Sequence, residues 1–260
     1  MKPFPTSCAP AALRLPHFLC LGAQRGGTTT LQLLLERHPQ VFLPACKEVH
    51  YFSLHADRGP QWYSDHFQAA APQALHGEVT PYYLFHPQAP ERIHALLPQA
   101  RLIVLLRDPV ERSLSQYFHS KQLSLEDLSL EQALAAEQER LAGAEEVLRS
   151  PGGRHRSHQE HSYLSRSRYE RQLPGWQALF PSQQLLILRS EDLFTDPAGI
   201  WERLQRFLTL TPVPLRGVLP RANASEGEAT SVSASLRQQL RQQLAPTYQA
   251  MAQDYGMHWP

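Results

Sequence analysis

Short apolar runs alternate with helix-like patterns along this chain. Four runs are typical of buried strands, the last of them weaker than the others: residues 17–21, 101–106, 185–188 and 76–79. After the first two, apolar residues recur at helical spacing over residues 28–38 and 110–123. Strands that alternate with helices form parallel sheets. We therefore predict the α/β class, with a central parallel sheet of about four to five strands flanked by helices on both faces.

Two longer helical patterns are expected to pack around this sheet. Residues 129–149 carry Leu and Ala at helical spacing, and Ser129 with Gln132 has the form of a capping box. A stripe of Leu, Tyr and Met predicts a closing helix over residues 233–254. Residues 210–235, which precede most of it, are rich in Pro, Ser and Ala and are expected to be irregular.

Residues 150–161 have no apolar period, and the Pro and Gly at their start prevent a continued helix. We expect a mobile, solvated loop here. His155, His158 and His161 recur at three-residue spacing, which a metal site could use, but arginines lie beside them. The prediction is therefore a solvated loop without a metal.

The composition fits one globular domain and excludes a nucleic-acid partner. With 260 residues, 42% of them hydrophobic, the chain can bury a full core, so residues 1–260 are expected to form a single domain. Its 25 Lys and Arg against 24 Asp and Glu leave a formal charge of +1, which gives no general field for holding a polyanion. Any anion must therefore be bound by a local site.

Cysteine usage and hydropathy indicate a cytoplasmic protein. The three cysteines are an odd number at irregular spacing, which fits a reducing compartment better than a disulfide framework. The longest apolar run in the interior, residues 102–106, is far shorter than the roughly 18–20 residues of a membrane helix. Prolines near the N-terminus interrupt every candidate signal-peptide core. We expect neither a transmembrane segment nor a cleaved signal.

The loop after the first strand carries the strongest chemical signal. Between Gly22 and Thr30, glycines can turn backbone N–H groups toward one point, and the next helix adds its positive end, so the loop can hold a phosphate. The spacing from Gly22 to Gly27 matches the start of a Walker A motif, but Thr28 stands where that motif requires lysine. The cation instead precedes the glycine pair, at Arg25. These features disfavour a magnesium-dependent NTPase.

At this point the sequence resembles the sulfotransferases that use 3′-phosphoadenosine 5′-phosphosulfate (PAPS), and among them the heparan sulfate 3-O- and N-sulfotransferases. The family's 5′-phosphosulfate loop is similar to residues 24–30, with lysine usual at the position of Arg25. Residues 105–117 resemble its 3′-phosphate motif, and residues 47–52 resemble the segment with its catalytic glutamate. The resemblance covers nearly the whole chain and implies a P-loop-like fold.

The resemblance also implies which residues bind the donor. The residues that would hold the 5′-phosphosulfate are Arg25, Gly26, Gly27, Thr28, Thr29 and Thr30. Arg107 and Ser115 would hold the 3′-phosphate. Arg107 follows a predicted strand, where parallel sheets bind ligands, and an arginine with a serine hydroxyl suits one phosphate.

The resemblance also implies that Glu48 is the base that takes the proton of the acceptor, with His50 as the alternative base. Arg25 would assist the transfer, and Lys47 is a further candidate contact to donor or acceptor. A sulfuryl group carries less charge than a phosphoryl group, so positioned donors can replace a metal at the leaving phosphate. PAPS is therefore the expected co-substrate, and no metal is expected.

The chain also departs from the family's pattern. Val79 stands where the heparan-type enzymes have a lysine, which removes one substrate-binding cation. Glu226 and Glu228 stand where a basic run would help to hold the nucleotide. A charge of +1 indicates no long basic groove for a sulfated glycan, which argues against heparan sulfate as the acceptor.

The sequence therefore predicts a PAPS-dependent sulfotransferase, a bacterial cytosolic member of the family. It would transfer a sulfuryl group to a hydroxyl or amine of a carbohydrate, glycolipid or small metabolite. Two alternatives stay open: a P-loop nucleotide kinase, and a non-catalytic protein that binds PAPS or its product 3′-phosphoadenosine 5′-phosphate (PAP). Thr28 disfavours the first, whereas Val79, Glu226 and Glu228 keep the second open.

Overall fold

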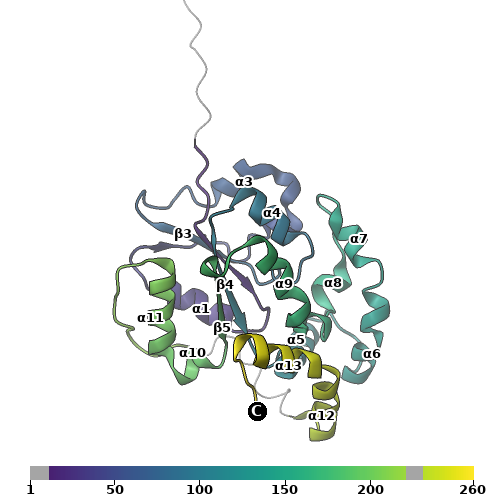
Figure 1. Cartoon of the computed structure of the whole chain (residues 1–260). Coiled ribbons are helices and arrows are strands. Elements are labelled where there is room, and N and C mark those ends of the chain that lie inside the picture. The colour runs from purple at the N-terminus through teal and green to yellow at the C-terminus, as the bar shows by residue number, and fades with distance from the viewer. Residues whose placement is uncertain (1–11, 221–230) are drawn as a thin grey trace, which may run out of the picture.

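A computed structural model describes residues 12–220 and 231–260, and it has a five-stranded sheet at its centre (Figure 1). Its strands are β1 (Phe18–Gly22), β2 (Val41–Phe42), β3 (Leu75–Val79), β4 (Arg101–Leu106) and β5 (Leu185–Arg189). Every pairing is parallel, in the order β2-β3-β1-β4-β5. The predicted α/β class and parallel sheet are confirmed.

The central strands are buried on both faces, as their continuous apolar sequences predict. Successive residues of a strand point to opposite faces, so β4 contributes to two hydrophobic cores. Leu102, Val104 and Leu106 pack in one core, and Ile103 and Leu105 pack in the other. The sheet is therefore covered on both sides, as expected.

Helices α4, α9 and α13 pack on the first core, and α1, α10 and α11 pack on the second. The helices of residues 12–122 are α1 (Thr28–Leu35), α2 (Tyr51–Leu54), α3 (Gly59–Asp65), α4 (Ala89–Leu96) and α5 (Pro109–Gln122). Those of the remaining described residues are α6 (Leu130–Arg140), α7 (Ala144–Arg149), α8 (Arg156–Glu160), α9 (Tyr169–Leu179), α10 (Asp192–Thr195), α11 (Pro197–Leu208), α12 (Ala234–Gln243) and α13 (Ala245–Tyr255).

Two predicted long helices are each divided in the structure. The pattern over residues 129–149 forms α6 and α7, which are separated at Gly143, a residue with a φ of 73° that ends regular helix. The closing helix over residues 233–254 forms α12 and α13, because Pro246 in the first turn of α13 cannot donate a helical hydrogen bond. The capping box of Ser129 and Gln132 is confirmed.

The prediction of a solvated loop over residues 150–161 is wrong. This segment contains α8, and His158 is buried with its ring stacked on Phe85 at 4.3 Å between centroids. His158 Nδ1 lies 2.8 Å from the Tyr82 hydroxyl, and His161 Nε2 lies 2.9 Å from the Leu125 carbonyl. His158 and His161 are held by contacts with residues that are distant in the sequence. The pattern of apolar residues within the segment cannot reveal such contacts.

Two negative findings hold for residues 12–220 and 231–260. No helix there combines the length and the apolar composition that crossing a bilayer requires. Within the same described ranges, no three His, Cys, Asp or Glu side chains are grouped as ligands for a metal ion.

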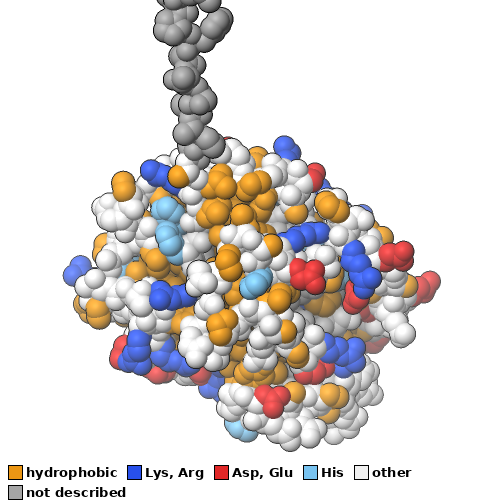
Figure 2. Space-filling view, turned by 45° about the horizontal axis from the view of Figure 1, so that its top comes forward, with side chains coloured by type: hydrophobic (Ala, Val, Ile, Leu, Met, Phe, Trp, Pro, Cys, Tyr) orange, Lys and Arg blue, Asp and Glu red, His pale blue; other side chains and the backbone are white. Residues whose placement is uncertain are grey.

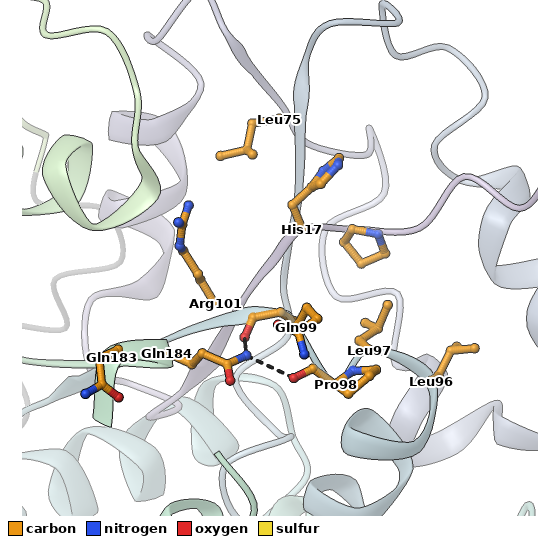
Figure 3. Close-up of a pocket in the computed structure, with 11 residues that line it drawn as sticks. His17, Leu75, Leu96, Leu97, Pro98, Gln99, Arg101, Gln183 and Gln184 are labelled. Carbon is orange, nitrogen blue, oxygen red and sulfur yellow. Dashed lines mark hydrogen bonds between the residues drawn. The ribbon is translucent and has the colours of Figure 1, made fainter. Parts of the chain in front are cut away.

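A groove of about 570 Å³ lies at the amino-terminal ends of the strands, where His17 precedes β1 and Arg101 begins β4 (Figure 3). The Gln184 amide in its wall donates to the Pro98 and Ala100 carbonyls at 3.0 and 2.9 Å. In Figure 2, hydrophobic side chains gather on the face just below the grey atoms, with His and basic side chains among them. The predicted anion loop lies at the other end of the sheet, after β1.

Candidate active site

The loop after β1 is held tightly against β4. Ala23 N donates to the Leu105 carbonyl at 2.8 Å, and Gly26 N donates to the Ala23 carbonyl at 2.9 Å. A Cβ on Gly26 would lie 2.7 Å from the Leu105 oxygen, and Gly27 has a φ of 87°, so both positions need glycine. Gly27 is followed by α1, whose first N–H groups have no partner within the helix. The loop therefore has the form of an anion-binding turn at a helix N-terminus.

Two arginines from separate motifs meet at this loop. Arg25 Nε donates to Ser115 Oγ at 3.0 Å, and Arg107 Nη1 donates to the Arg25 carbonyl at 3.4 Å. Burial and the charge of Arg107 lower the pKa of Arg25 to about 10, and burial also lowers the pKa of Arg107. Both side chains stay protonated at neutral pH and repel each other, which an anion between them would relieve.

The structure thus brings the predicted 5′-phosphosulfate residue Arg25 into direct contact with the predicted 3′-phosphate residue Ser115. The other loop side chains differ in accessibility. Thr28 and Thr30 are buried, and the Thr30 hydroxyl donates to the Pro220 carbonyl at 3.0 Å. The Thr29 hydroxyl accepts from Lys47 Nζ at 2.6 Å. Any donor contact by Thr28 or Thr30 would therefore come from the backbone.

The segment after β2 places the two predicted bases, Glu48 and His50, beside the same loop. Lys47, which binds Thr29, lies 3.6 Å from Glu48 Oε1, and His50 Nε2 lies 3.4 Å from Glu48 Oε2. His50 Nδ1 lies 3.0 Å from Ser53 Oγ. The Glu48 side chain is 33% exposed and that of His50 is 16% exposed, so Glu48 is the more accessible of the two to an acceptor.

The charge of Glu48 is stabilised by its neighbours. Burial by itself would raise the pKa of this carboxyl, but the hydrogen bond from His50 and the charge of Lys47 outweigh it. The pKa of Glu48 is therefore lowered from its ordinary value of 4.5. At neutral pH this carboxylate is ionised and can accept a proton.

Several residues at the site were not anticipated. Arg112 is fully buried, and its Nη1 and Nε atoms donate to the Gln24 carbonyl at 3.4 Å and to Ser167 Oγ at 2.6 Å. It thereby links the loop to the segment before α9. His119 lies one helical turn after Ser115, close enough for the charges of Arg25 and Glu48 to act on its pKa, which burial lowers. The i, i+4 spacing from Ser115 was the available signal for His119.

Of the three residues that depart from the family's pattern, only Val79 lies in the part of the chain that the structure describes. Val79 is buried in the second core, so it lies in the interior of the sheet. Glu226 and Glu228 lie outside the described residues.

Glu191 accepts hydrogen bonds from Asp108 N at 3.0 Å and from Trp259 Nε1 at 2.9 Å. The C-terminal segment is thereby attached to the start of α5.

These features define a class of site. A glycine loop opens a helix at the carboxyl ends of parallel strands, two half-buried arginines lie beside it, and an ionised carboxylate faces it. Such a site suits an anionic nucleotide donor and an acceptor that loses a proton.

Comparison with known proteins identifies the family. Residues 15–235 match the family described as "Sulfotransferase domain", and the chain belongs to it. The chain is 30% identical to "Membrane-associated sulfotransferase kil1" of Dictyostelium discoideum, with 85% of this chain and 62% of that protein aligned. It is 35% identical to human "Bifunctional heparan sulfate N-deacetylase/N-sulfotransferase 3", with 82% and 23% aligned. The resemblance to the heparan sulfate type is therefore confirmed.

The chain spans less than two thirds of the length of either relative. Among solved structures, a sulfotransferase from Alicyclobacillus acidocaldarius superposes with a TM-score of 0.75 at 24% identity, covering 94% of this chain and 97% of that one. That likeness confirms the predicted P-loop-like sulfotransferase fold. Membership of the family argues against the nucleotide-kinase alternative.

Proposed function

We propose that this chain is an enzyme that transfers a sulfuryl group from PAPS to a hydroxyl or amine of a carbohydrate, glycolipid or small metabolite. The observation that carries the proposal is the contact between three motifs that are far apart in the sequence. Arg107 and Ser115 both bind Arg25, and Lys47 joins Glu48 to Thr29. A carbohydrate acceptor is favoured because relatives are named for heparan sulfate.

In the proposed reaction, Gly26, Gly27 and the first N–H groups of α1 bind the 5′-phosphosulfate together with Arg25. Arg107 and Ser115 bind the 3′-phosphate. As the acceptor oxygen attacks sulfur, the bond from sulfur to the phosphate oxygen breaks and negative charge grows on that phosphate, where Arg25 stabilises it. Glu48 takes the acceptor's proton, and the products are the sulfated acceptor and PAP. The proposal assigns no step to a metal ion.

Nucleotide binding tests the proposal first. PAP is expected to bind with the same affinity with and without magnesium, since the arginines and the loop supply the positive charge. Isothermal calorimetry in buffers with magnesium or with EDTA measures this. If PAP bound only in the presence of magnesium, the alternative of a P-loop nucleotide kinase would be favoured.

Transfer of label from PAPS to an acceptor is the second test of the proposed function. Labelled PAPS is incubated with a panel of desulfated heparan sulfate oligosaccharides, simple sugars, glycolipids and small hydroxylated metabolites. Transfer of the label to any of these acceptors supports the proposed sulfotransferase activity. PAP binding without transfer to any acceptor favours the non-catalytic alternative.

Arg107 is expected to recognise the 3′-phosphate. Arg107→Ala should weaken PAP binding by about 2 kcal/mol, because a charged hydrogen bond is lost, and should barely change binding of adenosine 5′-phosphosulfate, which lacks that phosphate. Titration calorimetry with both nucleotides measures this. Arg101→Ala, at the partly buried opposite end of the same strand, is the matched control and should leave both affinities unchanged. Equal losses for both nucleotides in Arg107→Ala would mean that Arg107 is only structural.

The cytoplasmic location and bacterial origin remain predictions. They rest on the sequence features described above, whereas the relative from Dictyostelium discoideum is named as membrane-associated. Fractionation of the expressing cells, followed by immunoblotting, tests the location.

A further inference from the structure

The segment that carries Glu48 and His50 has an unusual backbone. Both residues have positive φ angles, 62° and 57°, in the left-handed region that residues other than glycine rarely adopt. Such conformations cost free energy and persist only where the surroundings hold them. Residues 48–52 must therefore be held by contacts outside the segment.

Three backbone N–H groups of this segment bind the end of β3 and the turn after it. Glu48 N donates to the Val79 carbonyl at 3.2 Å, His50 N donates to Thr80 Oγ1 at 3.5 Å, and Phe52 N donates to the Tyr83 hydroxyl at 3.3 Å. Two of these acceptors are side-chain hydroxyls, which can rotate. Their ability to accept depends on where their own protons point.

A buried carboxylate determines where those protons point. Glu78 is 1% exposed, and it accepts from Thr80 Oγ1 at 2.6 Å and from the Tyr83 hydroxyl at 2.8 Å. It also accepts from the Tyr63 hydroxyl, and the Tyr63 ring stacks on Tyr51 with centroids 4.4 Å apart. Burial raises the pKa of Glu78, and the hydrogen bonds from the three hydroxyls act in the opposite direction. In its ionised form Glu78 only accepts, so Thr80 and Tyr83 direct their protons toward it, which leaves their lone pairs for the N–H groups of His50 and Phe52.

We propose that Glu78 is a positioning residue, which acts through the hydroxyls of Thr80 and Tyr83 to hold residues 48–52 so that Glu48 faces the acceptor. The inference rests on the proposed function of Glu48 as the base. Glu78 itself touches neither Glu48 nor any atom that reacts. Its effect on catalysis is therefore indirect and can be separated from the effect of Glu48.

Amide hydrogen exchange provides a test that needs no acceptor. Glu78→Gln replaces one acceptor oxygen by an NH₂ donor, so at least one hydroxyl must turn away from its present partner. The N–H groups of His50 and Phe52, which Glu78 does not contact, are expected to exchange about tenfold faster. Glu137→Gln is the matched control, because Glu137 is also a buried carboxylate but binds the backbone of residues 164 and 165. It should leave exchange at residues 48–52 unchanged.

A second pair of variants keeps the test valid if Glu78→Gln does not fold. Thr80→Val removes the hydroxyl at nearly constant volume, and Thr80→Ser retains it. With labelled PAPS and desulfated heparan sulfate oligosaccharides, Thr80→Val is expected to lower kcat by about 10- to 100-fold, because the base is displaced. Thr80→Ser should restore most of kcat, and calorimetry should find PAP affinity within about twofold of wild type in both.

The outcomes separate this inference from the proposed function. Wild-type exchange rates at His50 and Phe52 in Glu78→Gln, or an unchanged kcat in Thr80→Val, would overturn the positioning role while leaving the sulfotransferase intact. A wild-type protein that transfers no label to any acceptor would overturn the proposed function, and the exchange rates would still decide whether Glu78 holds the segment.

Discussion

Glu48→Gln is expected to lower kcat by about 10²–10⁴ while PAP affinity changes little. Glutamine keeps the size of Glu48 and one of its two acceptor oxygens, but it cannot take the acceptor's proton. The measurement is the turnover rate at saturating PAPS, with calorimetry of PAP as the control. His50→Ala is compared under the same conditions. If His50 were the base, its replacement would have the larger effect, and near-normal rates in both variants would contradict both assignments.

The pH profile distinguishes the two bases independently. The pKa of Glu48 is lowered from 4.5, so the carboxylate stays ionised until the pH falls below that value. With Glu48 as the base, kcat should therefore stay level on the acid side down to about pH 4.5 and fall below it. A loss of activity well above that pH would contradict Glu48 as the base. In Glu48→Gln, the fall below pH 4.5 should disappear from the remaining activity.

Arg25→Ala is expected to lower the transfer rate about a hundredfold, equivalent to about 3 kcal/mol of transition-state stabilisation. The guanidinium of Arg25 stabilises a phosphate whose charge grows during transfer. Arg25 has a φ of 65°, and Ala and Lys carry the same backbone strain at that angle, so the comparison isolates the side chain. Arg25→Lys should keep much of the activity. Full activity in Arg25→Ala would remove Arg25 from the mechanism.

The fold was predictable where one strand or one turn carries the signal. The strand at residues 101–106 has the predicted bounds because all of its positions after the first are buried and apolar. Strand β2 was missed because Val41 and Phe42 form a two-residue edge strand, too short for a periodic pattern. The helix α8 was missed because His158 is buried by Phe85 and Tyr82, which are distant in sequence.

The same distinction holds for the candidate site: features carried by one contiguous segment could be predicted, and features made by residues distant in sequence could not. The position of the loop after β1 could be predicted because its glycines, its cation and the following helix are contiguous. The position of Arg107 at the same edge of the sheet could be predicted because it directly follows a strand. Their roles in binding the donor stay predictions. The contacts that hold the segment of Glu48 and the loop after β1 could not be predicted. Glu78 and Arg112 act through contacts with residues brought near only by folding, and in the sequence a buried charged residue looks like an exposed one.

The half-buried Arg25 at the loop also affects how the proposed reaction ends. Once sulfur has left, the 5′-phosphate of PAP carries a full terminal charge in place of the bridging oxygen. Arg25, which binds that phosphate in the proposed reaction, therefore attracts the product at least as strongly as the donor. Accumulated PAP is therefore expected to compete with fresh donor for the same site.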